Sequence, residues 1–458
     1  MFLGRELELT ELSAELKTKK KSAILVYGKR RIGKSSLIEQ AAKSFDGIVV
    51  SHLFSRTSYE GNLALLCRSV MAALSFPSTT SFDTIFDLFD FVQKQKKRIL
   101  FVLDEYQYFK ESRKNGEVDS YMQGIVDSIP NNIKIIFCGS YISVMKELLQ
   151  EDNPLFGRFT KILRIEEFDY LDAARFYPGL SVREKIRFYS VFGGSPYVLA
   201  NLDYKKPLEE NIKKNLISQD SLLRSYIENI MLREIQKNYD VRILEAIGNG
   251  KKRYNEIQNL VGMNDSGLLD KQLKNLMGME TVEKVFPINK PKDKKKQFYE
   301  IKDNLMRFYF TFIFANEALI SKFGQAVFFE NIIAPALNTF VSYRFEGIAN
   351  QYFMRLAQKG KLRGVTDFGS YWYDDPKKGM NGQFDCVLKD AGGYDFYEVK
   401  FYEKPMPRSE CESEEKEVRA LVEPNCKRIG FVCSSGFSFR SKEYNLISGK
   451  EIYDKELL

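Results

Sequence analysis

The sequence has few of the residues that several common kinds of active site need. Its 458 residues include one histidine, His52, and one tryptophan. A histidine-based metal centre or a serine–histidine–aspartate triad would have to use His52, so the sequence argues against both classes of site. His52 follows an apolar run, where a packed histidine is more common than a catalytic one.

Cysteines and long apolar runs are equally scarce. The six cysteines are spread along the chain and none forms a CxxC pair, which fits a reducing compartment better than a disulfide scaffold. No window approaches 18 uninterrupted apolar residues, and the charged start of the chain lacks the apolar core of a signal peptide. We therefore expect a cytoplasmic protein with no transmembrane helix and no membrane partner.

The overall composition is that of a globular protein, with 44% hydrophobic and 28% charged residues. The length suggests about three domains. The 69 basic and 61 acidic residues leave a net charge of +8. This charge is compatible with a nucleic-acid partner and does not require one.

The first 170 residues predict an α/β domain with a parallel, doubly wound sheet. Short apolar runs that read as strands buried on both faces alternate with amphipathic helical stretches. The runs cover residues 22–28, 47–54, 98–105, 134–140 and 162–168. Helical patterns follow over 171–235, interrupted by a GGSP segment at 193–196.

A glycine-rich loop, GKRRIGKSS, follows the first apolar run and fits the pattern GxxxxGK[ST]. Its glycines let the backbone fold around a phosphate, and the helix that follows adds partial positive charge. We expect Lys34 to contact the β- and γ-phosphates of ATP and Ser35 to ligate Mg²⁺. The candidate nucleotide-binding residues of this loop are Gly28, Lys29, Arg30, Arg31, Ile32, Gly33, Lys34, Ser35 and Ser36.

Acidic and polar residues at the ends of later strands complete the predicted site. Asp104 is expected to hold Mg²⁺, and Glu105 to act as the general base that orients the attacking water. Ser140 either senses the γ-phosphate or is an ordinary turn serine. Arg158 either serves as an arginine finger, in the same molecule or a neighbouring one, or is a surface arginine.

Several motifs occur in the order seen in archaeal-type ATPases of the AAA-like STAND group. They are FLGRELELTEL, GKRRIGKSS, LDEYQYF, CGSYISVM, NPLFGRF and GGSPYVL, and the resemblance covers about the first 235 residues. It implies a P-loop ATPase core over 1–170 and a helical lid over 171–235. It places Gly4, Arg5 and Glu6 near the adenine and implies nucleotide contacts for Gly194 and Pro196. Such proteins act more often as slow ATP-driven switches than as rapid motors.

Residues 236–302 predict a winged helix-turn-helix, because three short helical patterns precede two strand-like stretches around a basic loop. The third helix would carry Lys271, Gln272 and Lys274 toward DNA. The wing lysines suit phosphate contact better than base reading; they are Lys290, Lys292, Lys294, Lys295 and Lys296. Such modules also dock proteins or act as spacers, so both interpretations stay open.

Residues 303–458 predict a second α/β domain that contains the pattern D-x12-ExK, formed by Asp385, Glu398 and Lys400. Glu398 and Lys400 project from one face of a strand. This strand and the one that carries Asp385 are expected to form a hairpin that turns at residues 390–393, and an aromatic YWY segment at 371–373 precedes the first of the two. Two carboxylates can bind Mg²⁺, and a lysine beside them can assist the activation of water. The pattern resembles the PD-(D/E)xK nuclease superfamily, in which Glu346 would supply the helical acidic residue. The helix after ExK lacks the glutamine common in that family.

Together these features predict an ATP-binding, Mg²⁺-dependent ATPase switch. Its nucleotide state would control a winged helix and a restriction-endonuclease-like domain, with double-stranded DNA as a candidate partner. One alternative is an ATP-gated DNA-binding or protein-docking regulator whose C-terminal domain is catalytically silent. Another is a protein–protein switch that never meets nucleic acid, acting on a protein partner or a second copy of the chain.

Overall fold

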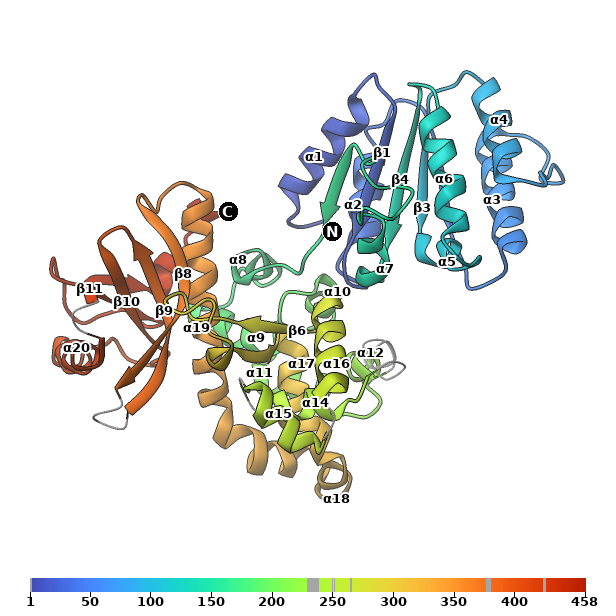
Figure 1. The fold of residues 1–458 in the computed structure, drawn as a ribbon. Coiled ribbons are helices and arrows are strands. Elements are labelled where there is room, and N and C mark those ends of the chain that lie inside the picture. The colour runs from blue at the N-terminus through green and yellow to red at the C-terminus, as the bar shows by residue number, and fades with distance from the viewer. Residues whose placement is uncertain are drawn as a thin grey trace. The chain divides into compact units, whose positions relative to one another are not determined.

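The computed structural model describes residues 2–228, 239–248, 250, 252–263, 266–375, 380–422 and 426–458. The chain forms two compact units, Met1–Glu167 and Phe168–Leu458 (Figure 1). Within the described ranges, no helix has both the length and the apolar character that crossing a membrane requires.

The first unit contains a five-stranded sheet in the order β2-β3-β4-β1-β5, and every strand pair is parallel. This confirms the predicted parallel α/β arrangement. The strands are β1 (Ser22–Tyr27), β2 (Ile48–Leu53), β3 (Ile99–Asp104), β4 (Ile133–Gly139) and β5 (Lys161–Arg164).

Burial along these strands follows their position in the sheet. The three inner strands, β1, β3 and β4, are buried along almost their whole length. The edge strands β2 and β5 alternate buried with more exposed residues, so the expectation that all five are buried on both faces was wrong for these two. An edge strand has a neighbour on one side only, which leaves part of its surface uncovered.

Helices cover both faces of this sheet (Figure 1). On one face, α1 (Glu6–Lys17) and α2 (Lys34–Ala42) enclose one apolar core. The second core lies under a larger group of helices. They are α3 (Tyr59–Leu74), α4 (Ile85–Lys94), α5 (Tyr106–Lys110), α6 (Glu117–Ser128) and α7 (Ile142–Glu147). Because both faces are covered, the edge formed by the carboxyl ends of the strands is where polar side chains can gather.

His52 lies on β2 and is packed, 4% exposed, against the edge of the Phe54 ring. Its Nδ1 lies 2.9 Å from the Ser69 hydroxyl oxygen, and Nε2 has no hydrogen-bond partner among the described residues. Burial lowers the pKa of His52 to about 4, from the ordinary value of 6.5.

Acidification should therefore destabilise the protein through His52. Between pH 6.5 and about 4 the unfolded chain binds a proton that the folded chain does not, so stability falls as the pH falls through this window. From pH 7.5 to pH 5 we expect a loss on the order of 1–2 kcal/mol from this residue. Urea unfolding at both pH values should show that loss in the wild type and not in His52→Leu. An equal loss in both proteins would contradict the prediction.

The second unit begins with helices and an antiparallel hairpin. The helices before the hairpin are α8 (Tyr170–Ala173), α9 (Val182–Phe192), α10 (Pro196–Ala200), α11 (Leu208–Ile212), α12 (Leu222–Tyr226), α14 (Arg242–Gly248), α15 (Tyr254–Val261) and α16 (Ser266–Gly278). The hairpin strands are β6 (Val282–Val285) and β7 (Phe298–Ile301), followed by α17 (Asn304–Phe308), α18 (Glu317–Phe328) and α19 (Ala334–Gln358). Short 3₁₀ or π turns lie between several of these elements: η1 (Ala174–Phe176), η2 (Lys213–Ile217), η4 (Lys294–Lys296), η5 (Tyr309–Ile313), η6 (Phe314–Asn316) and η7 (Phe329–Ile333). A further short turn, η8 (Lys455–Leu457), is the last element of the unit.

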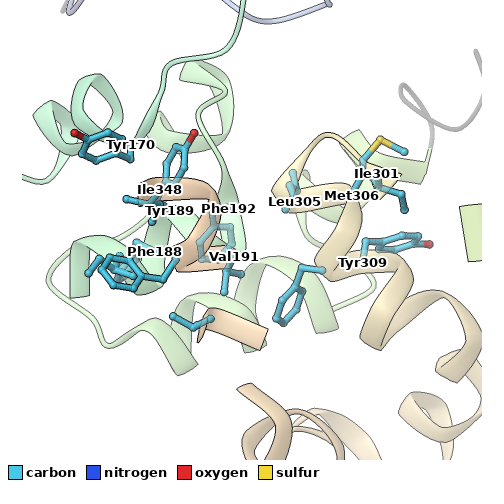
Figure 2. Close-up of a cluster of buried hydrophobic side chains, with 14 of the residues drawn as sticks. Tyr170, Phe188, Tyr189, Val191, Phe192, Ile301, Leu305, Met306, Tyr309 and Ile348 are labelled. Atoms are coloured by element: carbon cyan, nitrogen blue, oxygen red, sulfur yellow. The ribbon is translucent and has the colours of Figure 1, made fainter. Parts of the chain in front are cut away.

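One continuous apolar core joins these helices although they are far apart in the sequence. Figure 2 shows Phe188 and Phe192 of α9 in the same cluster as Leu305 and Met306 of α17 and Ile348 of α19. The early helices and the C-terminal part of the unit therefore stabilise one another, because neither could bury these side chains alone.

The C-terminal sheet is mixed, in the order β12-β11-β10-β9-β8. Its strands are β8 (Val365–Asp375), β9 (Met380–Asp390), β10 (Gly393–Lys400), β11 (Cys426–Cys433) and β12 (Asn445–Ser448), with α20 (Arg408–Val422) and α21 (Gly449–Ile452). The predicted hairpin at 390–393 is confirmed, since Gly393 pairs with Asp390. No strand was predicted for β8; its YWY segment was expected only to precede the first strand predicted in this domain, which corresponds to β9.

Candidate functional site

The glycine-rich loop joins β1 to α2 and passes very close to β5. A Cβ atom at Gly28 would lie 2.1 Å from the Ile165 carbonyl oxygen, so only glycine fits there. Gly33, just before α2, has φ 90°, a left-handed conformation that favours glycine. The loop therefore turns tightly and directs its backbone toward the start of α2.

Lys34 and Ser35 lie at the first turn of α2, where they meet the end of β3. Lys34 is 6% exposed, and its ammonium donates hydrogen bonds to the carbonyl oxygens of Gly28 and Lys29, at 2.9 and 2.7 Å. Burial lowers the pKa of Lys34, and nearby Glu105 and Asp104 oppose that shift. The Ser35 hydroxyl donates to Asp104 Oδ2 at 2.9 Å. A hydroxyl and a carboxylate at this distance are oxygen donors of the kind that Mg²⁺ prefers.

Glu105 is held by polar groups on two neighbouring elements. It caps α5 with φ 52°, and its backbone N–H donates to Asp104 Oδ1 at 2.9 Å. The Ser140 hydroxyl, just after β4, donates to Glu105 Oε2 at 2.8 Å. The amide of Gln107 also donates to Glu105 and lies 3.3 Å from the Ser140 hydroxyl oxygen. The structure thus brings Ser140 to Glu105.

The sequence analysis missed four residues around this site. They are Arg56, Gln107, Tyr108 and Tyr141. Gln107 is fully buried, and its Oε1 has no hydrogen-bond partner among the described residues. Arg56 follows the end of β2, so the carboxyl-end reasoning that selected Asp104 would also have selected Arg56.

The segment Gly4–Glu6 lies beside the loop through Arg5. Arg5 has φ 70° and a buried guanidinium that donates to the Ile32 carbonyl oxygen at 3.3 Å and to the carbonyl oxygen of Glu166. Gly4 is also left-handed, with φ 69°, and Glu6 begins α1 with its side chain exposed. Arg5 therefore fixes the start of α1 against the glycine-rich loop.

The remaining loop residues have different surroundings. Ile32 is buried in the core under α1 and α2. Lys29 pairs with Glu167 at 3.4 Å, whereas Arg31 and Ser36 are exposed. Arg30 turns toward Ser140, with Nε 3.3 Å from the hydroxyl oxygen.

Arg158 lies at the opposite edge of the sheet from the loop. It precedes β5, and the neighbouring Thr160 N–H donates to the carbonyl oxygen of Ala23, near the start of β1. Its guanidinium pairs with Asp127 at the end of α6, with Nε 3.0 Å from Oδ1. This position argues against action on the nucleotide of the same molecule.

Gly194 and Pro196 belong to the second unit. A Cβ at Gly194 would lie 1.7 Å from the Phe168 carbonyl oxygen, and the Gly194 carbonyl accepts a hydrogen bond from the Phe168 N–H at 3.0 Å. Pro196 is the first residue of α10. This close packing is by itself enough to require glycine at position 194.

The C-terminal pattern lies on adjacent strands. Val387 of β9 pairs with Phe396 of β10, and Asp385 and Glu398 each lie two residues further along. The side chain of Asp385 is outside the described part of the structure. Lys400 Nζ lies 2.7 Å from Glu414 Oε1 of α20 and 3.6 Å from Glu398 Oε2.

These ion pairs set the charge of Lys400. Burial works against the ammonium, but its contacts with Glu414 and Glu398 outweigh that effect and raise the pKa of Lys400. Within the ranges that the structure describes, no group of three metal-binding side chains is found.

Glu346 lies on α19, which covers the other face of this sheet from α20. The α19 ring of Phe353 packs on Tyr397, 4.7 Å between centroids, and Tyr397 points away from the Glu398 and Lys400 face. Glu346 interacts electrostatically with Arg344 on the same helix.

The candidate DNA-contacting residues of α16 are partly engaged within the protein. The side-chain oxygen Oε1 of Gln272 accepts from the Asp240 backbone N–H at 2.9 Å, and Lys274 pairs with Asp270 at 2.7 Å. Lys271 is exposed.

The loop between β6 and β7 attaches to the edge strand β8. The Ile288 N–H donates to the Ser370 carbonyl oxygen at 2.7 Å, and Asn289 exchanges two hydrogen bonds with the Trp372 backbone. Lys296 lies over the Trp372 ring at 4.2 Å. The side chain of Lys294 lies outside the described residues.

Comparison with known proteins agrees with the geometry of the loop. Residues 2–202 match a family described as an ATPase domain predominantly from Archaea. An uncharacterized protein of Methanocaldococcus jannaschii is 30% identical over 378 residues, which cover 81% of this chain and 82% of that protein. This chain belongs to the archaeal-type P-loop ATPases. Residues 309–419 of the ATPase match a second family, of archaeal and bacterial proteins of unknown function.

The fold is similar to that of a solved ATPase structure. The Walker-type ATPase of Pyrococcus abyssi has a TM-score of 0.50 and 19% identity, covering 68% of this ATPase and 96% of that chain. The ORC2 protein of Aeropyrum pernix has a lower TM-score of 0.44, with 13% identity over 69% of this ATPase and 95% of that chain.

Proposed function

We propose that this ATPase is a Mg²⁺-dependent switch that binds and hydrolyses ATP. The contact between the Ser35 hydroxyl and Asp104 Oδ2, at 2.9 Å beside Lys34 and Glu105, is the observation that carries the proposal. A hydroxyl, two carboxylates and an ammonium therefore lie close to one another beside the glycine-rich loop. That set matches the needs of phosphoryl transfer, which depends mainly on positioning and charge stabilisation.

Each side chain then has a defined task in hydrolysis. Lys34 turns from the loop carbonyls to the β- and γ-phosphates, and Glu105 orients the water for in-line attack on the γ-phosphate. Ser35 and Asp104 would hold Mg²⁺, which supplies positive charge to the phosphate oxygens. Ser140 and Gln107 keep the Glu105 carboxylate in place. Gly4, Arg5 and Glu6 line the adenine side.

We propose that nucleotide state controls the second unit. Residues 171–235 would form the lid, 236–302 a winged helix and 303–458 a nuclease-like domain acting on double-stranded DNA. Support comes from three helices followed by a hairpin, and from ExK on the central strand of a mixed sheet. Gly194 and Pro196 would contact the nucleotide from the lid. As an arginine finger, Arg158 would act on the nucleotide site of a neighbouring copy.

Two observations favour a second candidate, an ATP-gated docking or DNA-holding regulator with a silent C-terminal domain. The Glu414 carboxylate lies 2.7 Å from the Lys400 ammonium. The charge of the lysine is thus balanced by a residue outside the D-x12-ExK pattern. The loop of the candidate wing is hydrogen-bonded to β8 through Ile288 and Asn289, as a spacer would be.

DNA cleavage assays separate the two candidates. Supercoiled and linear DNA would be incubated with Mg²⁺ or Mn²⁺, with and without ATP. For a nuclease we expect nicking or linearisation that Glu398→Ala abolishes and that Glu417→Ala, an exposed change on α20, leaves intact. Lys34→Ala then reports whether ATP gates cleavage. If nothing is cut while Lys34-dependent hydrolysis persists, the silent regulator is the better description.

A further inference from the structure

Arg56 lies at the same sheet edge as the proposed nucleotide site, in the loop after β2. Its guanidinium lies over the Tyr108 ring at 5.1 Å and near the Tyr141 ring at 5.9 Å, and it donates a hydrogen bond to the Tyr141 hydroxyl. The side chain is exposed, and among the described residues it forms no ion pair with a carboxylate. Arg56 is therefore a full positive charge held only by two phenol groups.

A second guanidinium shares the same tyrosines. Arg30 of the glycine-rich loop donates to the Tyr108 hydroxyl at 2.6 Å and to the Tyr141 hydroxyl at 3.3 Å, and its guanidinium lies 5.0 Å from the Tyr141 ring centroid. Both guanidiniums donate to the Tyr141 hydroxyl, so two like charges lie close together and repel each other. The acidic residue with an electrostatic effect on Arg56 is Glu111, which acts through space. An anion between the guanidiniums would relieve the repulsion.

The position of this pair identifies the anion. Arg30 Nε lies 3.3 Å from the Ser140 hydroxyl oxygen, and Ser140 in turn donates to Glu105. The two arginines thus stand at the side of the loop where the proposed water-orienting carboxylate lies. In an in-line reaction that is the side of the terminal phosphate.

We propose that Arg56 binds the terminal phosphate of the nucleoside triphosphate in the same molecule, and so distinguishes the triphosphate from the diphosphate. This rests on the proposed function of the loop as an ATP site. A contact with a neutral phenol is weaker than a charge-assisted hydrogen bond to phosphate. Arg56 therefore leaves the tyrosines when the triphosphate binds, and returns to them when phosphate departs.

The test compares binding of fluorescent ATP and ADP analogues with steady-state ATP hydrolysis. We expect Arg56→Ala to weaken the ATP analogue about tenfold, to leave ADP affinity within about twofold, and to lower kcat about 10- to 100-fold. Arg56→Lys should recover part of the ATP affinity, because it keeps the charge and loses the bidentate geometry. The matched control is Arg68→Ala, an exposed arginine on α3.

The outcomes are distinguishable. Equal loss of ATP and ADP affinity in Arg56→Ala, or no loss of either, overturns the role of Arg56 while the ATP site stands. If wild type and Arg68→Ala both fail to bind ATP, the proposed function itself is wrong and the role of Arg56 falls with it. Circular dichroism of each variant confirms that the fold is intact.

Discussion

Lys34→Ala should lower ATP hydrolysis at least 100-fold and weaken ATP binding by a similar factor. Lys34 is buried under the glycine-rich loop, where burial already lowers its pKa, and among the described residues its ammonium donates only to backbone carbonyls of that loop. A phosphate oxygen is a better partner for this charge than a carbonyl oxygen. Phosphate release at saturating ATP and equilibrium titration with a fluorescent ATP analogue measure the two effects.

The matched control for this experiment is Lys43→Ala. Lys43 follows the last residue of α2 and pairs with Glu39 on the surface. Its replacement should leave hydrolysis within about twofold. Because alanine at 34 also removes two hydrogen bonds from the loop, Lys34→Gln is the second variant, and it should lose hydrolysis as well. Wild-type rates in both Lys34 variants would exclude this loop as the catalytic site.

Glu105→Gln should lower kcat by about 10²–10⁴ and leave ATP binding close to that of the wild type. Glutamine keeps the size and shape of the side chain and still accepts the hydrogen bond from Ser140 through its carbonyl oxygen. It loses the negative charge that orients and activates water. The variant should therefore hold ATP without turning it over, which single-turnover assays and analogue titration would detect.

The control for Glu105→Gln is Glu39→Gln, an exposed carboxylate on α2. A variant at position 105 that hydrolyses ATP at the wild-type rate would show that another group orients the water. A variant that loses binding and hydrolysis together would indicate that Glu105 supports the fold of the site more than the chemistry. This second result is physically plausible because Glu105 has φ 52° and caps α5.

The contact between Ser35 and Asp104 shows what sequence reasoning could not supply. The pattern GKS predicted a phosphate-binding loop after β1, and the apolar run before Asp104 predicted a strand that ends there. The strand order decides whether the two ends meet. In the sheet, β4 lies between β1 and β3, so Asp104 reaches Ser35 across the end of a strand that comes later in the sequence.

The residues that surround Glu105 were missed for a related reason. Gln107 follows Glu105 by two positions, and residues at this spacing in a helix do not face each other. The sequence therefore does not show where the Gln107 amide points. Only the fold brings its amide to Ser140, just after β4 and 33 positions later. Arg56 and Tyr141 likewise meet because β2 and β4 both end at one edge of the sheet.

The C-terminal half shows the same division. The alternation of Glu398, Val399 and Lys400 correctly placed Glu398 and Lys400 on one face of a strand, and the hairpin at 390–393 followed from its turn residues. The ion pair between Lys400 and Glu414 depended on which face α20 covers, and α19, with Glu346, covers the other. The sequence pattern does not encode which helix covers which face.

By itself, the sequence determined the local features of this protein. Apolar runs indicated the strands because a strand buried on both faces is mostly apolar, as the inner strands β1, β3 and β4 are. The glycine spacing fixed the phosphate-binding loop because only glycine tolerates the close approach of Gly28 to Ile165. The tertiary structure alone decided the strand order, the helix that covers each face and the partner of each charged side chain. All three depend on contacts between residues far apart in the chain. Burial of the shared apolar cores selects these contacts together, and no local sequence pattern encodes them.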